Sequence, residues 1–426
     1  MLYFSRGSEN DLITTHDLQS GLNEALEKLG SRQKVLALPP DFTRYHSRAG
    51  ELTSYVSDYY GKSLSDVLPA LGTHFAMTDT EIGKMFPGVP LSLFRVHKWR
   101  TDVITLGEVP GSFVSGVSEG RVDYGWPAQV NKLLVEGGHD LILSIGQVVP
   151  HEVTGMANYN KNVLVGTGGA EGINKSHFLG AAYGMERMMG RAVNPVRMVL
   201  NYASEKFTAH LPIVYILTVV GAGDDGKLIT RGLFIGDDHE CFMRAADLSL
   251  KVNFTMLDKP LEKVVVYLDP DEFKSTWLGN KSIYRTRMAI ADGGELIVLA
   301  PGLRQFGEDK EIDRLIRRYG YLTTPEILRL VDEKDDLRGN LSAAAHLIHG
   351  SSENRFRVTY CPGHMSRKEI NSVNYSFASL DEMVKKYDPN SFIPGLNITN
   401  EGEEIFFISN PALGLWSSRD RFGAGI

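Results

Sequence analysis

Short runs of β-branched and other apolar residues alternate with amphipathic helical patterns along most of this chain. Parallel strands cannot be joined by tight turns and need crossover connections, which are usually helices. The alternation therefore predicts parallel sheets in an α/β architecture. The run DLILSIG, from Asp140 to Gly146, is nearly all apolar, as expected of a strand that is buried on both faces of such a sheet.

The same patterns assign the main elements. We expect helices at residues 18–29, 64–71 and 282–291 and from Thr78 onward, and strands at 35–38, 140–146, 263–268 and 295–299. Thr78 and Glu81 have the spacing of a capping box, which marks a helix start. Two further runs, 212–220 and 228–235, flank the segment GAGDDGK and predict an antiparallel hairpin. Asp292-Gly293-Gly294 is expected to end a helix before the strand at 295–299.

A chain of 426 residues is too long for one average domain. The charged, Pro-containing segment LDKPLEK predicts a joint near residue 260. We therefore expect two α/β domains with mostly parallel sheets, residues 1–260 and 261–426.

Composition excludes several classes of protein. The chain has 45 basic and 52 acidic residues and a formal charge of −7, so a nucleic-acid or acidic-membrane partner is not expected. Its two cysteines, Cys241 and Cys361, rule out a disulfide framework and a Cys-rich zinc site. The apolar run at 211–220 is shorter than the roughly 18–20 residues that span a bilayer, and the N-terminus lacks the apolar segment of a signal peptide. These features predict a soluble, cytoplasmic protein.

Two glycine-rich segments have weak functional interpretations. Gly166-Thr-Gly168-Gly169 follows no clean strand, which argues against a dinucleotide loop. Residues 221–227 have the GxxxxGK spacing of a phosphate loop, but Leu228 stands where a Ser or Thr belongs, so a turn is favoured. His346 and His349 are spaced i, i+3 on a predicted helix, and we favour a solvated helix face over a metal site for them.

Three other histidines have companions that suggest chemistry. His74 follows a Gly-Thr turn, His151 follows Val-Val-Pro, and His177 lies in a segment rich in Gly and Asn that we expect to be a loop. Open α/β sheets bind ligands outside the carboxyl ends of their strands. Polar residues of similar predicted loops are Asp41, Arg44 and Lys161. Together, the six residues predict one composite site.

These residues lie in motifs that resemble the nickel-pincer lactate racemase family along most of the chain. The matching segments are DFTR (41–44), GTHFAMT (72–78) and DLILSIGQVVPHEVTG (140–155), followed by Lys161 and His177. The resemblance implies a two-domain α/β enzyme with its active site in the interdomain cleft, the first domain binding the cofactor and the second lying on the substrate side. It also implies a nickel-pincer nucleotide, a pyridinium-3-thioamide-5-thiocarboxylate mononucleotide that cofactor-synthesis enzymes supply.

The roles implied by the resemblance carry over position by position. Lys161 matches the lysine that forms the covalent thioamide link, and His177 matches the histidine that ligates nickel. His74 and His151 match the pair of acid/base histidines. The Asp and Arg that help to hold cofactor and substrate correspond to the two ends of DFTR, Asp41 and Arg44.

Two segments depart from the family pattern. On a helix of the second domain, the family binds the substrate carboxylate with a Gln and a Lys, whereas this chain has Arg285 and Met288 there, with Arg287 adjacent. Arg binds a carboxylate through two parallel hydrogen bonds, so Arg285 and Arg287 are candidate substrate ligands. The family's small residues before the lysine are replaced here by Asn158-Tyr159-Asn160, and we expect Tyr159 to contact the substrate.

The sequence therefore predicts a racemase or epimerase that inverts C2 of a small-molecule 2-hydroxy acid by hydride transfer. A carbanion at C2 beside a carboxylate is poorly stabilised, and imidazole is too weak a base to form it. The polar run before Lys161 favours a polyhydroxylated sugar acid, such as gluconate or mannonate, over lactate. The alternatives are a metal-dependent dehydratase of sugar acids and a carrier or sensor that binds the pincer nucleotide without turnover.

Overall fold

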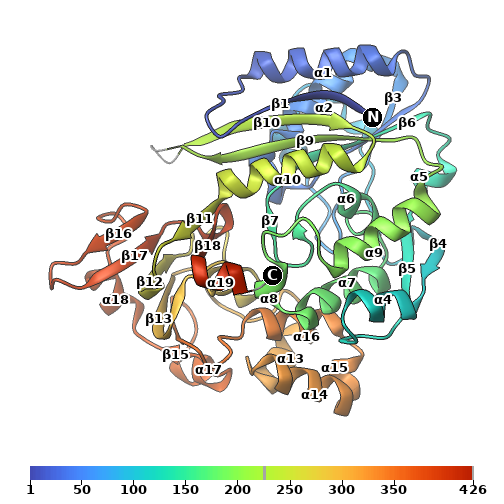
Figure 1. Cartoon of the computed structure of the whole chain (residues 1–426). Coiled ribbons are helices and arrows are strands. Elements are labelled where there is room, and N and C mark those ends of the chain that lie inside the picture. Colours follow the sequence, from blue (N-terminus) through green and yellow to red (C-terminus); the bar gives the residue numbers. More distant parts are fainter. Residues whose placement is uncertain (224–226, 425–426) are drawn as a thin grey trace. The chain divides into compact units, whose positions relative to one another are not determined.

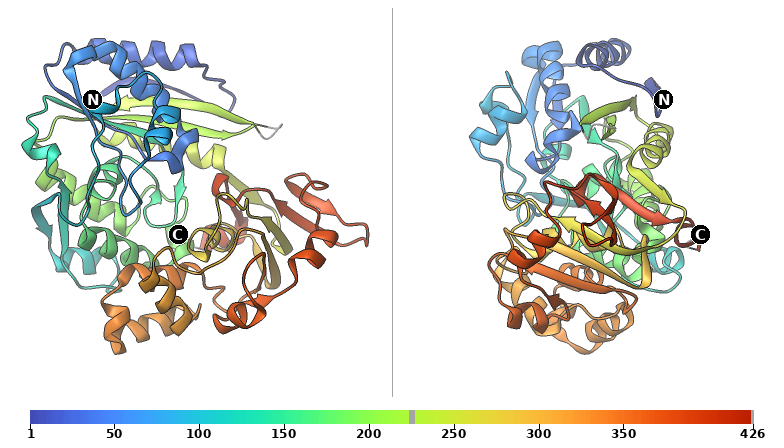
Figure 2. Two further views of the ribbon diagram at one scale, coloured as in Figure 1. Left: turned by 180° about the vertical axis from the view of Figure 1, so that it is seen from behind. Right: turned by 90° about the vertical axis from the view of Figure 1, so that its left-hand side faces the viewer.

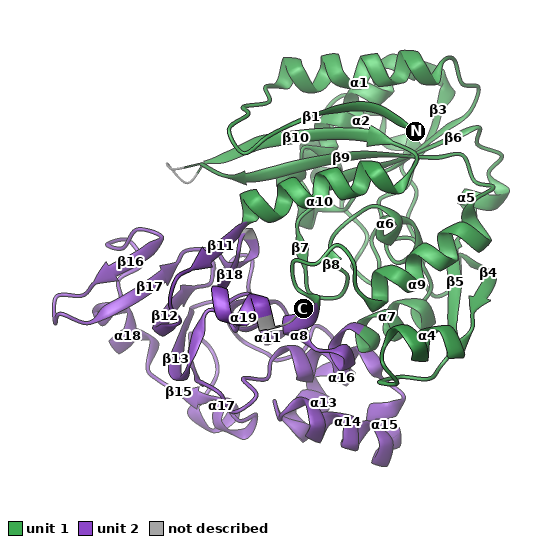
Figure 3. Ribbon diagram, in the orientation of Figure 1, with its two compact units in different colours: residues 1–179, 188–253 green, residues 180–187, 254–426 purple. Residues whose placement is uncertain are grey.

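The apolar run of DLILSIG forms the strand β6 (Leu141–Gln147) in the middle of a six-stranded sheet. This computed structural model describes residues 1–223 and 227–424. The chain divides into two compact units, one formed by residues 1–179 and 188–253 and the other by residues 180–187 and 254–426 (Figure 3). The joint predicted near residue 260 lies at the start of strand β12 (Leu261–Tyr267).

The first unit is built on a mixed sheet. In spatial order its strands are β1 (Leu2–Gly7), β10 (Leu228–Gly236), β9 (Ile213–Ala222), β6, β2 (Val35–Leu38) and β3 (Leu64–Val67). The four strands from β9 to β3 run parallel, and β1, β10 and β9 pair antiparallel. The predicted strands at 35–38 and 140–146 and the predicted hairpin are confirmed. Residues 224–226 at the tip of the hairpin, within the GxxxxGK segment, lie outside the described residues.

Helices cover both faces of this sheet (Figures 1 and 2). One face packs against α1 (Thr15–Leu29) and α2 (Ala49–Tyr60), whose apolar side chains form a core with residues of β2, β6 and β9. The other face packs against α10 (His239–Asn253). The remaining helices of this unit are α3 (Asp79–Met85), α4 (Gly111–Val117), α5 (Leu133–Glu136), α6 (Asn160–Leu164), α9 (Pro195–Ala203) and the first part of α7 (Ala170–Tyr183).

The helix predicted at 64–71 is wrong. Residues 64–67 form β3, which pairs with β2 in parallel, and the helix of this region is α2. Leu64, Val67 and Leu68 are all buried, and a short apolar run of this kind has no periodicity that separates strand from helix. The capping box at Thr78 and Glu81 is present at the start of α3. Gly166 follows helix α6 and not a strand.

The second unit contains a mostly parallel sheet. Its strands, in spatial order, are β15 (Ser376–Phe377), β14 (Arg357–Pro362), β13 (Ile290–Ala300), β12, β17 (Glu404–Ile408) and β16 (Gly395–Ile398). Only the pair of β16 and β17 is antiparallel among these described strands. Helix α18 (Leu380–Lys386) packs against β12 and β13 through Leu380, Met383 and Val384. The predicted fold class, α/β with mostly parallel sheets, is confirmed in both units.

Two predictions for this unit are wrong. The helix expected at 282–291 is limited to α12 (Lys281–Tyr284), and Asp292-Gly293-Gly294 lies inside β13. Leu261 pairs with Ile290 and Lys263 pairs with Glu295, so the extra residues of β13 bulge out between these pairs. Gly293 accommodates the bulge with a φ of +83°.

His346 and His349 do not lie on a solvated helix face. Helix α16 (Leu341–His349) is buried along most of its length, and the exposed fractions of the two histidines are 4% and 5%. His346 shares a hydrogen bond of 2.9 Å with the hydroxyl of Tyr321 and stacks on Trp277. Burial lowers the pKa of His346 well below 6.5, so this histidine is a neutral core residue.

Three small two-stranded sheets complete the described strands: β4 (Val103–Val109) with β5 (Trp126–Asn131), β7 (Pro150–His151) with β8 (Gly155–Met156), and β11 (Phe254–Leu257) with β18 (Leu415–Ser418). Cys241 and Cys361 are buried free thiols. None of the helices in residues 1–223 and 227–424 is long and apolar enough to cross a bilayer.

Candidate functional site

Three of the predicted site residues follow neighbouring parallel strands of the first unit. Asp41 follows β2, His74 follows β3, and His151 follows β6, and these strands are adjacent in the order β6, β2, β3. Parallel neighbours end at the same edge of a sheet, which is where α/β proteins bind their ligands. The sheet topology therefore brings the three residues to one edge, as the sequence predicted.

His74 and Asp41 form a hydrogen-bonded pair. Nδ1 of His74 lies 2.5 Å from a carboxylate oxygen of Asp41. The Asp41 side chain is 7% exposed, whereas that of His74 is 57% exposed. An ionised carboxylate only accepts hydrogen bonds, so Nδ1 of His74 is the donor to Asp41, and Nε2 is the ring nitrogen left for other partners.

The environment of Asp41 keeps its carboxylate ionised. Burial works against ionisation, but the hydrogen bond and charge of His74, the hydroxyl of Thr43 and the nearby cation of Arg44 outweigh it, so the pKa of Asp41 lies below its usual value. The same side chain accepts a hydrogen bond from the backbone N–H of Thr43 and caps the short 3₁₀ helix at residues 42–47. This cap holds the Asp41 carboxylate in place at the end of β2.

His151 has a different contact at Nδ1. It lies on the tight β7–β8 hairpin and is buried. The backbone N–H of Val153 donates a hydrogen bond of 3.1 Å to Nδ1 of His151, so the neutral ring carries its proton on Nε2. The carboxylate of Glu152 lies 3.9 Å from the same Nδ1. The contacts at Nδ1 thus differ between the two histidines: His74 donates from this atom to Asp41, whereas His151 accepts there from Val153.

Lys161 lies in the first turn of α6, which is tied to the central sheet by its neighbour Asn162. The Asn162 amide donates to the carbonyl of Leu38 at the end of β2 and to the hydroxyl of Ser144 in β6, at 2.9 and 3.0 Å. Burial and the nearby cation of Arg44 lower the pKa of Lys161 from 10.5 to about 8, against the opposing charges of Glu152 and Asp41. Part of this amine is therefore neutral and nucleophilic near neutral pH.

His177 lies on helix α7 and not in a loop, so that expectation is wrong. The Gly- and Asn-rich stretch around it, EGINKSHFLGAA, continues as one helix. Nδ1 of His177 donates a hydrogen bond of 2.7 Å to the carbonyl of Ile173 one turn earlier, which leaves the lone pair on Nε2. Burial and the nearby Lys161 lower the pKa of His177, although the bond to Ile173 opposes the shift. Histidines that bind metals usually have this form, a ring whose other nitrogen donates to a carbonyl or carboxylate oxygen.

The six predicted residues come together within the first unit. The charges of Asp41 and Arg44 act on Lys161, and those of Lys161 and His74 act on His177. A backbone hydrogen bond of 2.8 Å from Gly72 to the carbonyl of Gly166 joins the His74 loop to the connection between α6 and α7. Within residues 1–223 and 227–424, no group of three or more His, Cys, Asp or Glu side chains could hold a metal ion.

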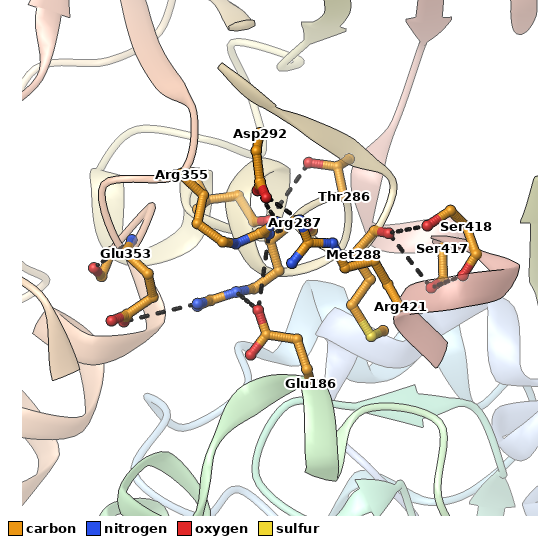
Figure 4. A network of polar contacts seen from close by, with 12 residues as sticks. Glu186, Thr286, Arg287, Met288, Asp292, Glu353, Arg355, Ser417, Ser418 and Arg421 are labelled. Atoms are coloured by element: carbon orange, nitrogen blue, oxygen red, sulfur yellow. Dashed lines mark hydrogen bonds and ion pairs between the residues drawn. The ribbon is translucent and has the colours of Figure 1, made fainter. Parts of the chain in front are cut away.

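The predicted substrate arginines lie in the second unit and are buried. Arg285 is 1% exposed and donates to the carbonyl of Gly414 at 3.3 Å. Arg287 is 2% exposed; its Nε lies 2.9 Å from Glu186 and its guanidinium lies 3.7 Å from Glu353. Figure 4 draws the contacts of Arg287 with both carboxylates. Two carboxylates thus already neutralise the charge of Arg287. The substrate role of both arginines stays a prediction.

The Asn158-Tyr159-Asn160 run is also occupied by protein contacts. Tyr159 is 8% exposed and packs against Tyr215 and Phe242. The side-chain amide of Asn160 donates to Asn201 at 2.7 Å, and the side-chain oxygen of Asn158 accepts from the backbone N–H of Tyr159 at 2.7 Å. These contacts leave the sequence argument for a polyhydroxylated substrate without structural support, and contact between Tyr159 and substrate stays a prediction.

Sequence analysis did not identify three residues that surround the site. Asn162 holds α6 on the sheet, Glu152 contributes charge beside Lys161 and His177, and Arg197 of α9 binds the loop before Lys161. Glu152 could have been found from the sequence, because it is a carboxylate next to a candidate catalytic histidine. Asn162 and Arg197 could not, since their hydrogen-bond partners are distant in the sequence.

Comparisons with known proteins agree with this architecture. A crystal structure of a protein from Thermotoga maritima is 25% identical, with a TM-score of 0.81, and the match covers 97% of this chain and 100% of that chain. The lactate racemase apoprotein from Thermoanaerobacterium thermosaccharolyticum shares the fold, at 18% identity and a TM-score of 0.69, over 97% of this chain and 94% of that chain. No curated protein sequence matches the chain.

A family model described as the lactate racemase N-terminal domain matches residues 16–188. This segment contains all six residues of the site in the first unit. The model match and the shared fold confirm the resemblance that the motifs indicated. Residues 16–188 are thus similar to the lactate racemase N-terminal domain, and the chain shares its fold with a lactate racemase apoprotein.

Proposed function

We propose that the chain is an isomerase that inverts C2 of a 2-hydroxy acid with a nickel-pincer nucleotide. One observation carries this proposal: a buried amine, Lys161, and an imidazole with an open Nε2, His177, share a site with the Asp41–His74 pair. This set combines a point of covalent attachment, a nitrogen ligand and a general base.

The residues of the site fit such a group. An amine forms a thioamide only in its neutral state, and the lowered pKa of Lys161 provides that state. His177 would supply one nitrogen ligand through Nε2, and imidazole is a suitable ligand for nickel. When bound, this nucleotide supplies a reversible acceptor for hydride, so that the substrate passes through a 2-keto acid.

The chain's own residues then handle the proton of the substrate hydroxyl. His74 takes this proton on Nε2, while Asp41 holds Nδ1–H and stabilises the imidazolium that forms. His151 donates a hydrogen bond from Nε2–H to the oxygen at C2, and it exchanges roles with His74 when the opposite isomer reacts. We propose that the guanidinium of Arg44, whose charge acts on both Asp41 and Lys161, binds the substrate carboxylate.

The substrate class remains open to a direct test. A sugar acid of the gluconate or mannonate type is our proposal from the sequence, with lactate as the competing substrate. A site built to bind hydroxyl groups rejects a substrate that lacks them by roughly 10⁴–10⁵-fold. Epimerisation of gluconate or mannonate, with slow turnover of lactate, is expected. Efficient racemisation of lactate without turnover of the sugar acids would refute the sugar-acid proposal.

The reaction itself is tested with single enantiomers that carry deuterium at C2, using chain produced together with cofactor-synthesis enzymes. Hydride transfer keeps the deuterium in the inverted product, whereas proton abstraction replaces it with solvent hydrogen. The Lys161→Ala variant is the matched control and should be inactive. A dehydratase would release water and form a keto-deoxy acid. A carrier or sensor would hold the nucleotide without turnover, and either result would contradict the proposed isomerase.

A further inference from the structure

The two residues that precede helix α6 have unusual backbone conformations. Asn158 has a φ of +61°, and Tyr159 has φ +59° and ψ −138°. Asn tolerates positive φ, but a bulky aromatic residue rarely adopts it, and the region occupied by Tyr159 favours glycine. Tyr159 is the N-cap of α6, two residues before Lys161. The strained turn therefore sets the direction in which α6 presents the Lys161 amine.

Aromatic rings hold the side chain of Tyr159 in this conformation. The centroid of its ring lies 4.4 Å from the ring centroid of Tyr215 on β9 and 5.0 Å from that of Phe242 on α10. The rings of Tyr159 and Phe242 are stacked, with an angle of 15° between their planes. Both partners belong to rigid elements of the central sheet and its covering helix. We call Tyr159, Tyr215 and Phe242 the aromatic cage. Strain at a turn persists only where surrounding contacts over-determine it, and the cage supplies those contacts.

Arg197 binds the same turn from α9. Its guanidinium donates to the carbonyls of Met156 and Asn158, at 2.6 and 3.3 Å, and to the side-chain oxygen of Asn160. It also lies 4.4 Å from the ring centroid of Phe242, as a cation over an aromatic face. Arg197 is 1% exposed, and its buried Nε has no hydrogen-bond partner among the described residues. One buried cation thus contacts three alternate residues of the turn, Met156, Asn158 and Asn160, and the Phe242 ring of the aromatic cage.

The charge of Arg197 is not neutralised by a carboxylate within residues 1–223 and 227–424; its hydrogen-bond acceptors are amide oxygens. Its field reaches Lys161 and opposes protonation of the amine. The other charged or titratable groups that act on Lys161 are Arg44, Glu152 and Asp41, and Lys161 in turn acts on His177. Arg197 is therefore both a brace for the turn and a fixed positive charge near the amine.

We propose that Arg197 and Tyr159 are positioning residues that hold the turn before helix α6 so that the Lys161 amine is correctly oriented for covalent attachment of an acyl group. This inference rests on the proposed role of Lys161 as the attachment residue. Arg197 acts through its charge and its hydrogen bonds, and Tyr159 acts through the backbone conformation that the aromatic cage stabilises.

The test measures the acylation rate of Lys161 in the full chain produced without cofactor-synthesis enzymes. Trace acetic anhydride is the probe: the neutral amine attacks one carbonyl, acetate leaves, and the amine proton passes to the buffer. Peptide mass spectrometry gives the rate at Lys161 between pH 6 and 10, relative to the exposed Lys259 in the same sample. The wild-type profile should have its midpoint near pH 8.

Arg197→Met should raise the midpoint and lower the relative rate at pH 7.5, by about tenfold for each unit of pKa regained. Arg197→Lys, which restores the cation, should recover most of the rate. Tyr159→Gly, in which the backbone accepts positive φ without strain but the ring is lost, should lower the plateau rate and keep the midpoint. Arg244→Met removes a surface arginine paired with Glu240 and should leave the profile unchanged.

Wild-type rate and midpoint in a folded Arg197→Met variant would overturn the role of Arg197, and a wild-type plateau in Tyr159→Gly would overturn that of Tyr159. If Arg197→Met does not fold, the other two variants test the proposal. Arg197→Lys should then have an acylation rate close to that of the wild type, and Tyr159→Gly should have a lowered plateau rate. A wild-type chain that acquires no pincer adduct in cells would refute the proposed function and leave the acylation result standing.

Discussion

Nδ1 of His74 lies 2.5 Å from a carboxylate oxygen of Asp41, and the carboxylate is the more buried of the two groups. The pair fixes Nδ1 of His74 as the donor to Asp41 and leaves Nε2 for other partners. His151 has the reverse arrangement, because the backbone N–H of Val153 occupies its Nδ1. A two-base mechanism on this scaffold therefore starts from two chemically different histidines.

Asp41→Asn should lower turnover by about 10²-fold or more, because an amide cannot stabilise the imidazolium of His74. Asn still caps the helix at residue 42, so folding should be preserved. The matched control is Asp66→Asn, since Asp66 forms a similar buried pair with His139, at 3.0 Å, outside the site. The control should lose stability and keep turnover per folded molecule. Equal losses of turnover in the two variants would mean that Asp41 acts only through folding.

His74→Ala and His151→Ala should each lower the rate by about 10²–10⁴-fold, the usual contribution of a positioned acid or base. A full cycle uses both histidines, so each loss should affect both directions of the reaction. Steady-state rates from each enantiomer measure this. Wild-type turnover by either variant would contradict the two-base scheme.

Lys161→Met should change how stability of the cofactor-free chain depends on pH. The pKa of Lys161 is about 8 in the folded chain and 10.5 in the unfolded chain. Between these values the unfolded wild type binds more protons, so its stability rises with pH. Below pH 8 the variant should therefore be the more stable of the two by at most about 3 kcal/mol, and the difference should vanish towards pH 10.5. Urea unfolding at pH 7, 9 and 10.5 measures it; a constant difference would contradict the lowered pKa.

His177→Ala should lose nickel while the organic part of the cofactor stays attached through Lys161. The reason is that His177 is the only protein ligand proposed for the metal, whereas the thioamide link involves another residue. Plasma mass spectrometry gives the nickel content, and the mass of the intact chain gives the adduct. Nickel at wild-type stoichiometry in this variant would place the ligand elsewhere.

The sequence predicted the sheet and its site edge because these depend on local patterns. The buried strands β2 and β6, which precede Asp41 and His151, are recognisable as apolar runs, whereas β3, the strand before His74, was mistaken for a helix. His177 was expected in a loop because Gly and Asn disfavour helices, but packing of α7 overrides that preference. The strained turn at Tyr159 could not be predicted, since its causes, Arg197, Tyr215 and Phe242, are far away in the sequence.

Peptide mass spectrometry of chain produced with cofactor-synthesis enzymes shows whether Lys161 carries a nickel-pincer nucleotide. We expect one adduct per chain, on Lys161, together with nickel, and neither in the Lys161→Ala variant. Interconversion of 2-hydroxy acid enantiomers by a chain whose Lys161 is unmodified, or an adduct on a different residue, would contradict this expectation.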